Sequence, residues 1–348
     1  MMQASGECGE GGSTALWEAM LLNSDRTDAA PAQQPSEQRR LSEQRRLAAK
    51  THGRIRAASH VDDVANSTTD SAHNRHMRTY LTACLYEKKG ANWVPWQLDV
   101  AKPGTSPHLQ SDKCAKHAYH YAYSRYLAPL AERFVNGELH SVKVLEIGLG
   151  CGQRNVGAGV RLWNALFANA PDGRKLTLHV LEYDARCARL WQARFANEFT
   201  NVMLTIFTGD QSNATTLEDL AINGGGEYDA IVDDGGHSMN QMQMSLHHLF
   251  KLVKPGGWYA IEDLQTSYDS HYGGISHGRR GRASSGNQTA TTELIGHMIG
   301  WMSGDPTELA AWQYTYGKVS RLTFEHVVHD LEHVDCYSEI CVLIRYTK

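Results

Sequence analysis

The sequence lacks several features that define large classes of protein. No run of about 18 apolar residues occurs, so we expect no membrane-spanning helix. Residues 1–30 lack the basic start and apolar stretch of a secretory signal. The net charge of −4 offers no general basic field for nucleic acid. Because 41% of the residues are apolar and 21% are charged, a wholly disordered chain is also excluded. We therefore expect a globular protein that binds neither nucleic acid nor membrane.

Cysteine pairs of the CxxC type are also absent. The chain has 7 cysteines, an odd number that does not match a complete disulfide framework. Buried or idle thiols in a reducing compartment fit this usage better. We predict a cytoplasmic protein, although the basic segment 39–56 leaves a nuclear or organellar location open.

Aromatic residues are scarce in residues 1–75, where Trp17 is the single example. The sequence Ser-Glu-Gln-Arg-Arg-Leu occurs twice in succession, at 36–41 and 42–47. A targeting or anionic-surface patch is one interpretation of this basic stretch. We favour the simpler one, a low-complexity, disordered tail over 1–75, because its apolar content is too low to offset ordering.

Strand and helix patterns alternate through the rest of the chain. This alternation predicts an α/β fold, with a mostly parallel sheet, helices on both faces and an antiparallel strand pair at the end. The predicted strands are 142–147, 176–181, 202–207, 228–232, 257–261, 334–339 and 340–346. The predicted helices are 116–134 (kinked or broken at Pro129), 160–170, 185–199, 216–222, 239–252 and 291–302. We interpret 254–257 as a turn and the long connection 264–292 as a lid loop.

Glycines follow the first predicted strand, in the sequence Val-Leu-Glu-Ile-Gly-Leu-Gly-Cys-Gly over 144–152. A strand, a glycine turn and a helix allow a nucleotide to approach the backbone closely, which makes Gly148 and Gly150 candidate cofactor-binding residues. A dinucleotide fingerprint would place its third glycine one residue later. With Glu146 two residues ahead of the glycines, the motif is similar to motif I of S-adenosylmethionine-dependent methyltransferases.

Polar residues also end the second and third predicted strands. Glu182 directly follows an apolar run, where a carboxylate can accept hydrogen bonds from ribose hydroxyls. Asp184 is an alternative that would instead cap the next helix. Asp210 and Gln211 follow the third strand, where adenine can be hydrogen-bonded; a turn and helix cap is the alternative there.

Four carboxylates and a histidine end the fourth and fifth predicted strands: Asp233, Asp234, His237, Glu262 and Asp263. Because the carboxyl ends of parallel strands share one edge, these groups should converge. So many acids repel one another unless a cation neutralises them, and hard oxygen ligands suit Mg²⁺. Adjacent strand residues point to opposite faces. We therefore expect Asp234 to face the metal and Asp233 to face the cofactor or the interior.

Taken in order, these motifs resemble one family. The residues that carry the resemblance are Asp112, Lys113, His117, Tyr119 and Tyr126, then LEIGLGCG, LEYD, GDQ, DDGGH, KPGG and IEDLQTSY. They are similar to class I methyltransferases that include the demethylmacrocin and mycinamicin VI O-methyltransferases. The motif sequences are more similar still to uncharacterised eukaryotic members, the hard-surface induced protein-like proteins. The resemblance covers about residues 110–275 and, weakly, the last 15.

The resemblance implies a Rossmann-like methyltransferase fold and a set of roles. Asp234, Glu262 and Asp263 would hold Mg²⁺, and His237 would be the general base. Gly236 departs from the family, which usually has Ser there, and the loop 273–286 is rich in Gly and Arg. The domains would be a helical cap and substrate region at 76–135 and an S-adenosylmethionine-binding domain at 136–348.

The predicted reaction is methyl transfer to a hydroxyl of a small acceptor, such as a sugar or a phenol. Mg²⁺ would lower the pKa of that hydroxyl, and His237 would take its proton. A homo-oligomer is left open. Two alternatives also stay open: a methyltransferase-like binding protein without turnover, and a nucleotide-dependent oxidoreductase.

Overall fold

A computed structural model gives the positions of a defined part of the chain. The described residues are 72, 75, 76, 79, 80, 111, 113, 117, 119–153, 155–274, 290–305, 307–312 and 322–347. All of them belong to the unit Arg56–Lys348. The predicted tail, apart from Ala72 and Arg75, and positions 275–289 of the predicted lid lie outside the described residues.

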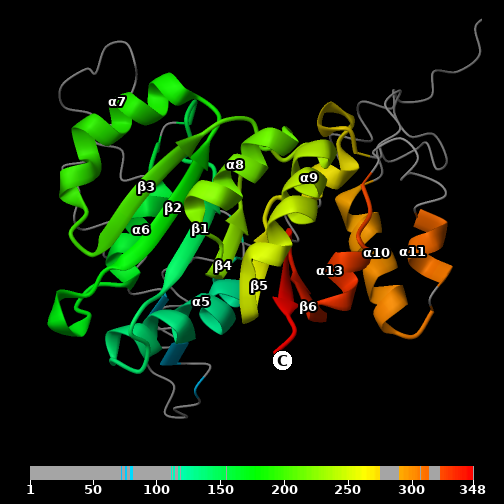
Figure 1. Ribbon diagram of the computed structural model, residues 1–348, viewed down its shortest axis with the longest axis horizontal. Coiled ribbons are helices and arrows are strands. Elements are labelled where there is room, and N and C mark those ends of the chain that lie inside the picture. The colour runs from blue at the N-terminus through cyan, green and yellow to red at the C-terminus, as the bar shows by residue number, and fades with distance from the viewer. Residues whose placement is uncertain are drawn as a thin grey trace, which may run out of the picture. The chain divides into compact units, whose positions relative to one another are not determined.

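Seven strands form one mixed sheet (Figure 1). Their bounds are β1 Lys143–Ile147, β2 Leu176–Glu182, β3 Val202–Thr208, β4 Tyr228–Asp233, β5 Val253–Ile261, β6 Leu331–Tyr337 and β7 Ile340–Arg345. The strand order is β3-β2-β1-β4-β5-β7-β6. Strands β1 to β5 pair in parallel, and β7 runs antiparallel to both β5 and β6. This confirms the predicted Rossmann-like methyltransferase fold with its antiparallel C-terminal pair.

Helix α5 precedes the sheet, and the other helices follow β1 to β5 along the chain. Their bounds are α5 His120–Val135, α6 Ala158–Leu166, α7 Ala185–Phe195, α8 Ala214–Gly224, α9 Met239–Leu249, α10 Thr291–Met302, α11 Thr307–Trp312 and α13 Glu325–His329. Short 3-10 helices lie at Pro171–Gly173, Ala196–Glu198, Phe250–Leu252, Leu264–Tyr268 and Ser270–Tyr272. Helices α11 and α13 were not predicted. Within the described part of the chain, each helix is too short or too polar to cross a bilayer.

Two apolar cores cover the two faces of the sheet. Residues of α5, α6 and α7 form one core with Val144 of β1, and residues of α8, α9, α10 and α13 form the other with Leu145. Neighbouring strand residues enter opposite cores because side chains alternate along a strand. With helices on both faces, ligands have access to the sheet at its carboxyl edge.

Two local predictions differ from the structure. Pro129 lies inside α5, which runs without a break from His120 to Val135. The predicted turn 254–257 lies within β5, where the register against β4 shifts between the pairs Tyr228–Val253 and Ala230–Trp258. The extra residues are accommodated as a bulge, so the proline and glycines interrupt the pairing without ending the strand.

The cysteine prediction is wrong for four of the seven residues. Cys151 forms a disulfide with Cys187, and Cys336 forms one with Cys341. The first joins the glycine turn after β1 to helix α7, a contact between segments that are 36 residues apart. The second joins directly opposed residues of the β6–β7 hairpin. Sequence spacing revealed neither pair, because each depends on strand register or on helix packing. The compartment stays a prediction.

Candidate active site

A cavity of about 700 Å³ lies at the carboxyl edge of the sheet. This volume is within the ordinary range for a small-molecule site. Its lining includes the glycine turn, Glu182, Gln211, and the residues that follow β4 and β5. It therefore brings together the carboxyl ends of the five parallel strands, β1 to β5.

The glycine turn requires glycine at its first position. Gly148 has φ +103°, and a Cβ there would collide with the carbonyl oxygen of Asp234. Its N–H donates to the carbonyl oxygen of Leu181 at 2.8 Å. Gly150 also has a positive φ, but a Cβ there would meet one atom, at 3.9 Å. The close approach of the chains after β1 and β4 is thus the specific reason for Gly148.

Glu146 and Glu182 line the cavity together with the glycine turn, and both are buried. The Glu146 carboxylate accepts a hydrogen bond from Trp163 Nε1 at 2.7 Å, and the absence of a side chain on Gly159 makes room for it. Glu182 accepts from the backbone N–H of Leu149 at 2.9 Å and from that of Asp184 at 2.9 Å. The predicted ribose acceptor therefore also holds the glycine turn in place.

The structure places Asp184 as a helix cap. Its side chain accepts hydrogen bonds from the backbone N–H groups of Arg186 and Cys187 at the start of α7. This agrees with the alternative interpretation of Asp184. Asp210 forms a turn, in which its carboxylate accepts from the N–H of Ser212, and it is not among the residues that line the cavity.

Gln211 connects the segment after β3 to the end of β4 through hydrogen bonds to Asp233 and Gly236. Gln211 Nε2 donates to Asp233 at 3.0 Å, and its Oε1 accepts from the N–H of Gly236 at 2.8 Å. Asp233 also accepts from the Tyr259 hydroxyl at 3.1 Å. Burial raises the pKa of Asp233 to about 6, against these hydrogen bonds. Gln211 lines the cavity but Asp233 does not, so Asp233 faces the interior.

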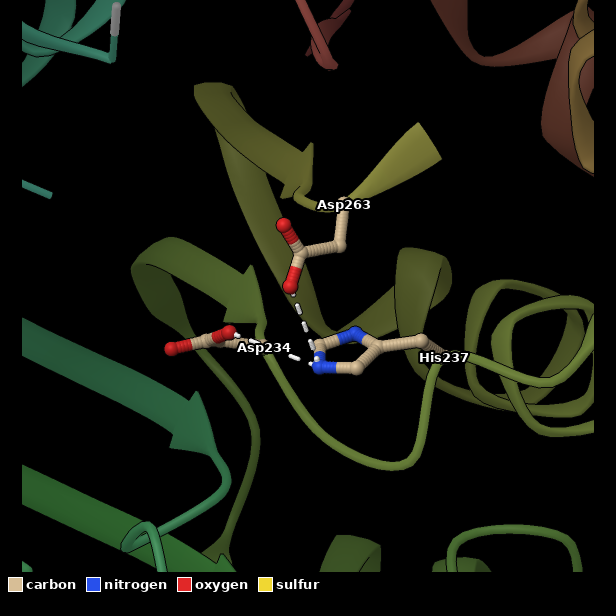
Figure 2. Close-up of side chains that lie close together, drawn as sticks. All are labelled: Asp234, His237 and Asp263. Atoms are coloured by element: carbon tan, nitrogen blue, oxygen red, sulfur yellow. Dashed lines mark ion pairs between the residues drawn. The ribbon is translucent and has the colours of Figure 1, made fainter. Parts of the chain in front are cut away.

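Three predicted residues line the cavity, namely Asp234, His237 and Asp263. Their side chains point toward one another (Figure 2). His237 Nε2 lies 3.2 Å from Asp263 Oδ2 and 3.9 Å from Asp234 Oδ1. One ligand atom from each of the three residues lies within 4.8 Å of the others. The two carboxylates offer oxygen donors of the kind that a divalent cation such as Mg²⁺ takes, and the imidazole lies beside them.

Unusual backbone conformations aim two of these side chains. His237 has φ +57° and Asp263 has φ +54°. Both values lie in the left-handed region, which residues other than glycine rarely adopt. Asp263 is held there by Tyr119, whose hydroxyl donates to its Oδ1 at 2.8 Å and accepts from its N–H at 2.9 Å. Strain of this kind is concentrated at functional sites, where surrounding contacts maintain it.

Glu262, the third predicted metal ligand, is not one of these three residues, although its carboxylate and that of Asp234 contact the same Lys113 ammonium. It is 1% exposed and does not line the cavity. Its Oε2 accepts from Lys113 Nζ at 2.8 Å, and its Oε1 accepts from the Tyr123 hydroxyl. Both residues follow the end of β5, and the left-handed backbone of Asp263 directs its carboxylate differently from that of Glu262.

Neighbouring charges and hydrogen bonds determine the protonation states of Lys113 and Asp263. Burial alone would lower the pKa of Lys113, but Asp234 and Glu262 raise it well above its usual range. Burial would raise the pKa of Asp263, but the hydrogen bond from Gln265 and the nearby His237 outweigh it and lower that pKa. Lys113 therefore stays an ammonium and Asp263 a carboxylate near neutral pH.

Sequence reasoning gave no role to Lys113, Tyr119 or Tyr123, although the first two belong to the motifs of the resemblance. Tyr119 immediately precedes α5, and Tyr123 lies in its first turn. Because the two residues are four apart, their side chains lie on one face of the helix. That spacing is a usable signal. The contacts that these residues make with Glu262 and Asp263 span about 140 residues and could not be read from local patterns.

Comparison with known proteins confirms the resemblance. The chain is 28% identical over 204 residues to demethylmacrocin O-methyltransferase of Streptomyces fradiae, which covers 55% of this chain and 47% of that protein. It is 34% identical over 161 residues to 8-demethyl-8-alpha-L-rhamnosyl tetracenomycin-C 2'-O-methyltransferase of Streptomyces olivaceus, which covers 45% and 36%. The chain thus spans less than half the length of these curated relatives. The similarity to eukaryotic members stays a prediction.

No protein-family model matches the chain. Among solved structures, the chain is similar to the MycE methyltransferase of the mycinamycin biosynthetic pathway in complex with Mg and SAH. That similarity has 22% identity and a TM-score of 0.43, and covers 65% of this chain and 53% of that one.

Proposed function

We propose that this chain transfers a methyl group from S-adenosylmethionine to a hydroxyl group of a small acceptor, with the help of Mg²⁺. One observation carries the proposal. A single cavity contains both the glycine turn with Glu182 and the group formed by Asp234, His237 and Asp263. The first part suits a nucleoside with a ribose diol, and the second suits an acceptor that must lose a proton.

The glycine side of the cavity would bind the cofactor. When bound, S-adenosylmethionine supplies a methyl group on a positively charged sulfur. Gly148 and Gly150 line the cavity, and Glu182 offers carboxylate lone pairs beyond those that its backbone N–H partners use. Glu146 and Gln211 line the same part of the cavity. These residues bind and orient the cofactor, and alignment is the largest contribution that a protein makes to a direct displacement.

The acidic side would bind the acceptor. Asp234 and Asp263 would hold Mg²⁺ together with Glu262, whose carboxylate shares Lys113 with that of Asp234. When bound, Mg²⁺ lowers the pKa of a nearby hydroxyl. An acceptor hydroxyl between these carboxylates would lie against His237 Nε2, the atom placed to take its proton. Asp263, 3.2 Å away, would stabilise the resulting imidazolium. Acceptors with neighbouring hydroxyls, such as sugars and catechol-like phenols, fit this arrangement best.

The names of the relatives support a sugar acceptor. One of them is named as the methyltransferase of a rhamnosyl tetracenomycin. The acceptor of this chain is therefore sought first among glycosides with a free diol and second among phenols. The compartment and the oligomeric state are separate predictions, on which the site does not bear.

The test has a binding stage and a turnover stage. Calorimetry should show binding of S-adenosylhomocysteine to the full chain. Labelled S-adenosylmethionine should then label an acceptor in a screen of glycosides and phenols, with Mg²⁺ and not with EDTA. His237→Ala should lower the rate by about 10²–10⁴-fold, the usual contribution of a positioned base.

His333→Ala provides the control, because that partly exposed histidine lies on β6, outside the residues that line the cavity. Cofactor binding without labelling of any acceptor would favour the binding protein without turnover. Binding of a nicotinamide dinucleotide in place of S-adenosylhomocysteine would favour the oxidoreductase.

A further inference from the structure

A disulfide joins two segments on the cofactor side of the cavity. Cys151 lies in the glycine turn and lines the cavity, and it is bonded to Cys187 in the first turn of α7. The bond links the segment after β1 to the segment after β2, which are the two segments that the proposed function assigns to the cofactor. No step of the proposed methyl transfer uses this bond, so its position calls for a separate explanation.

The bond fixes the middle of a loop whose base is closed by a backbone hydrogen bond. At the base, the Gly157 N–H donates to the Leu149 carbonyl oxygen at 2.8 Å. Cys151 stands between Gly150 and Gly152, both of which have a positive φ and little or nothing near the Cβ position. Glycine populates many backbone conformations, so this stretch has much freedom to lose when it is held in one of them. The bond to α7 removes part of that freedom in advance.

The two cysteines of this bond differ in access. Cys151 is partly exposed where it lines the cavity, whereas Cys187 is 3% exposed. The bond of the β6–β7 hairpin also has an exposed residue, Cys336, but neither Cys336 nor Cys341 lines the cavity. A reductant can therefore reach both bonds, and of these two it meets the first at a wall of the cavity.

We propose that the Cys151–Cys187 disulfide is a redox switch for cofactor binding: the oxidised chain holds the glycine turn ready for S-adenosylmethionine, and reduction by a dithiol loosens the turn and weakens binding. The inference rests on the proposed function, because it assumes that the cofactor binds in this cavity. A turn that is mobile before binding must lose that freedom when the cofactor orders it, and the loss reduces the affinity.

The redox step is an ordinary thiol–disulfide exchange. A thiolate of the dithiol attacks Cys151 Sγ, the S–S bond breaks, and Cys187 leaves as a thiolate. The second thiol of the reductant then displaces Cys151 from the mixed disulfide. The reductant becomes a disulfide, two electrons pass to the protein, and each cysteine sulfur takes up a proton.

Calorimetry of the full chain with S-adenosylhomocysteine, before and after reduction by dithiothreitol, tests the switch. Reduction should weaken binding by about tenfold, which corresponds to ordering roughly one additional residue. Cys187→Ser, which cannot form the bond, should bind like the reduced chain whether or not dithiothreitol is present. The double variant Cys336→Ser/Cys341→Ser is the matched control, and it should lose affinity on reduction as the unaltered chain does. A tenfold loss on reduction of Cys187→Ser would assign the effect to another cysteine and overturn the inference.

A second measurement needs no variant, because binding and reduction are coupled in both directions. If reduction weakens S-adenosylhomocysteine binding tenfold, the bound ligand must favour the disulfide by the same factor. Peptide mapping after alkylation, in a buffer of reduced and oxidised dithiothreitol, measures the fraction of each disulfide that remains. Saturating S-adenosylhomocysteine should shift the equilibrium of Cys151–Cys187 about tenfold towards the disulfide and leave that of Cys336–Cys341 unchanged. An equal shift of both bonds, or of neither, would contradict the inference, even if Cys187→Ser does not fold.

The same titrations distinguish this inference from the proposed function. If the chain binds S-adenosylhomocysteine equally well before and after reduction, the switch is overturned while the proposed function stands. If neither the oxidised nor the reduced chain binds S-adenosylhomocysteine, the proposed function fails as well.

Discussion

The two sides of the cavity are built in different ways. On the cofactor side, backbone N–H groups of the glycine turn donate to the Leu181 carbonyl oxygen and to the Glu182 carboxylate, both at the end of β2. On the acidic side, Asp234, Glu262 and Asp263 are held by side chains of Lys113, Tyr119 and Tyr123, about 120 to 150 residues earlier in the chain.

This difference has a physical basis. A nucleoside is recognised by close backbone approach, for which local glycine conformations suffice. Charged groups that must stay close together need neutralising partners in low-dielectric surroundings, and these partners can come from any part of the fold. The cofactor side should therefore respond to changes in backbone shape, and the acidic side to changes in distant charge.

The largest expected effect comes from the point where the two sides touch. Gly148→Ala should place a Cβ against the Asp234 carbonyl oxygen and should lower the free energy of unfolding by about 4 kcal/mol or more. Gly152→Ala is the matched control, because Gly152 also has a positive φ but has open space around its Cβ position. Denaturant unfolding of both variants measures the difference. Equal losses would mean that positive φ, and not the contact with Asp234, sets the requirement.

The two disulfides offer a second comparison between the cavity and the sheet edge. Cys187→Ser opens a link between residues 36 apart and should lower the free energy of unfolding by about 4 kcal/mol. Cys341→Ser opens a link between residues 5 apart and should cost about 2 kcal/mol, by the same loop-entropy relation. Because Cys151 lines the cavity, Cys187→Ser alone should also weaken S-adenosylhomocysteine binding. Unfolding and calorimetry without reductant provide both readouts; equal effects on cofactor affinity would contradict this expectation.

A third prediction separates the two sides by ligand. Glu182→Gln replaces one carboxylate oxygen by an amide that cannot accept from the N–H groups of both Leu149 and Asp184. S-adenosylhomocysteine affinity should fall by about 10- to 100-fold, or roughly 1.4–2.7 kcal/mol, while Mn²⁺ affinity stays within about threefold. Asp263→Asn should show the reverse pattern. A variant that weakened both ligands equally would show that the two sides are not independent.

The smallest effect concerns acid, to which two buried residues of the sheet that do not line the cavity should respond with opposite sign. Burial and the nearby Lys143 lower the pKa of His179 on β2 to about 4, so its contribution to stability is lost as the pH falls from about 6.5 towards 4. Burial raises the pKa of Asp233 on β4 to about 6, so stability is gained as the pH falls from about 6 towards 4. Between pH 7 and pH 5 the effect should amount to about 2 kcal/mol for His179 and about 1 kcal/mol for Asp233.

Denaturant unfolding at both pH values tests these signs. Relative to the unaltered chain, His179→Gln should lose less stability on acidification, and Asp233→Asn should lose more. The same sign in both variants would show that other groups dominate the acid response of this fold.

Much of the fold could be predicted because its signals are local. Apolar runs of strand length ending in glycine or acid located β1, β2, β3 and β4 to within about two residues. The carboxyl-edge rule then placed Glu182, Asp234, His237 and Asp263 around one cavity. Helices α11 and α13 were missed, since segments of six and five residues carry too little periodicity to detect.

The sequence by itself determined the order of the strands along the chain, the glycine turn and the residue types at the carboxyl edge, because these follow from hydrophobic period and chain direction. Only the tertiary structure decided that Asp233 faces the interior, that Glu262 binds Lys113 and Tyr123, and that Cys151 meets Cys187. Each of these contacts depends on the direction of a side chain near the end of a strand. It also depends on which residues of a distant segment pack against that side chain. Such contacts are fixed by packing across the whole domain, so no local pattern encodes them.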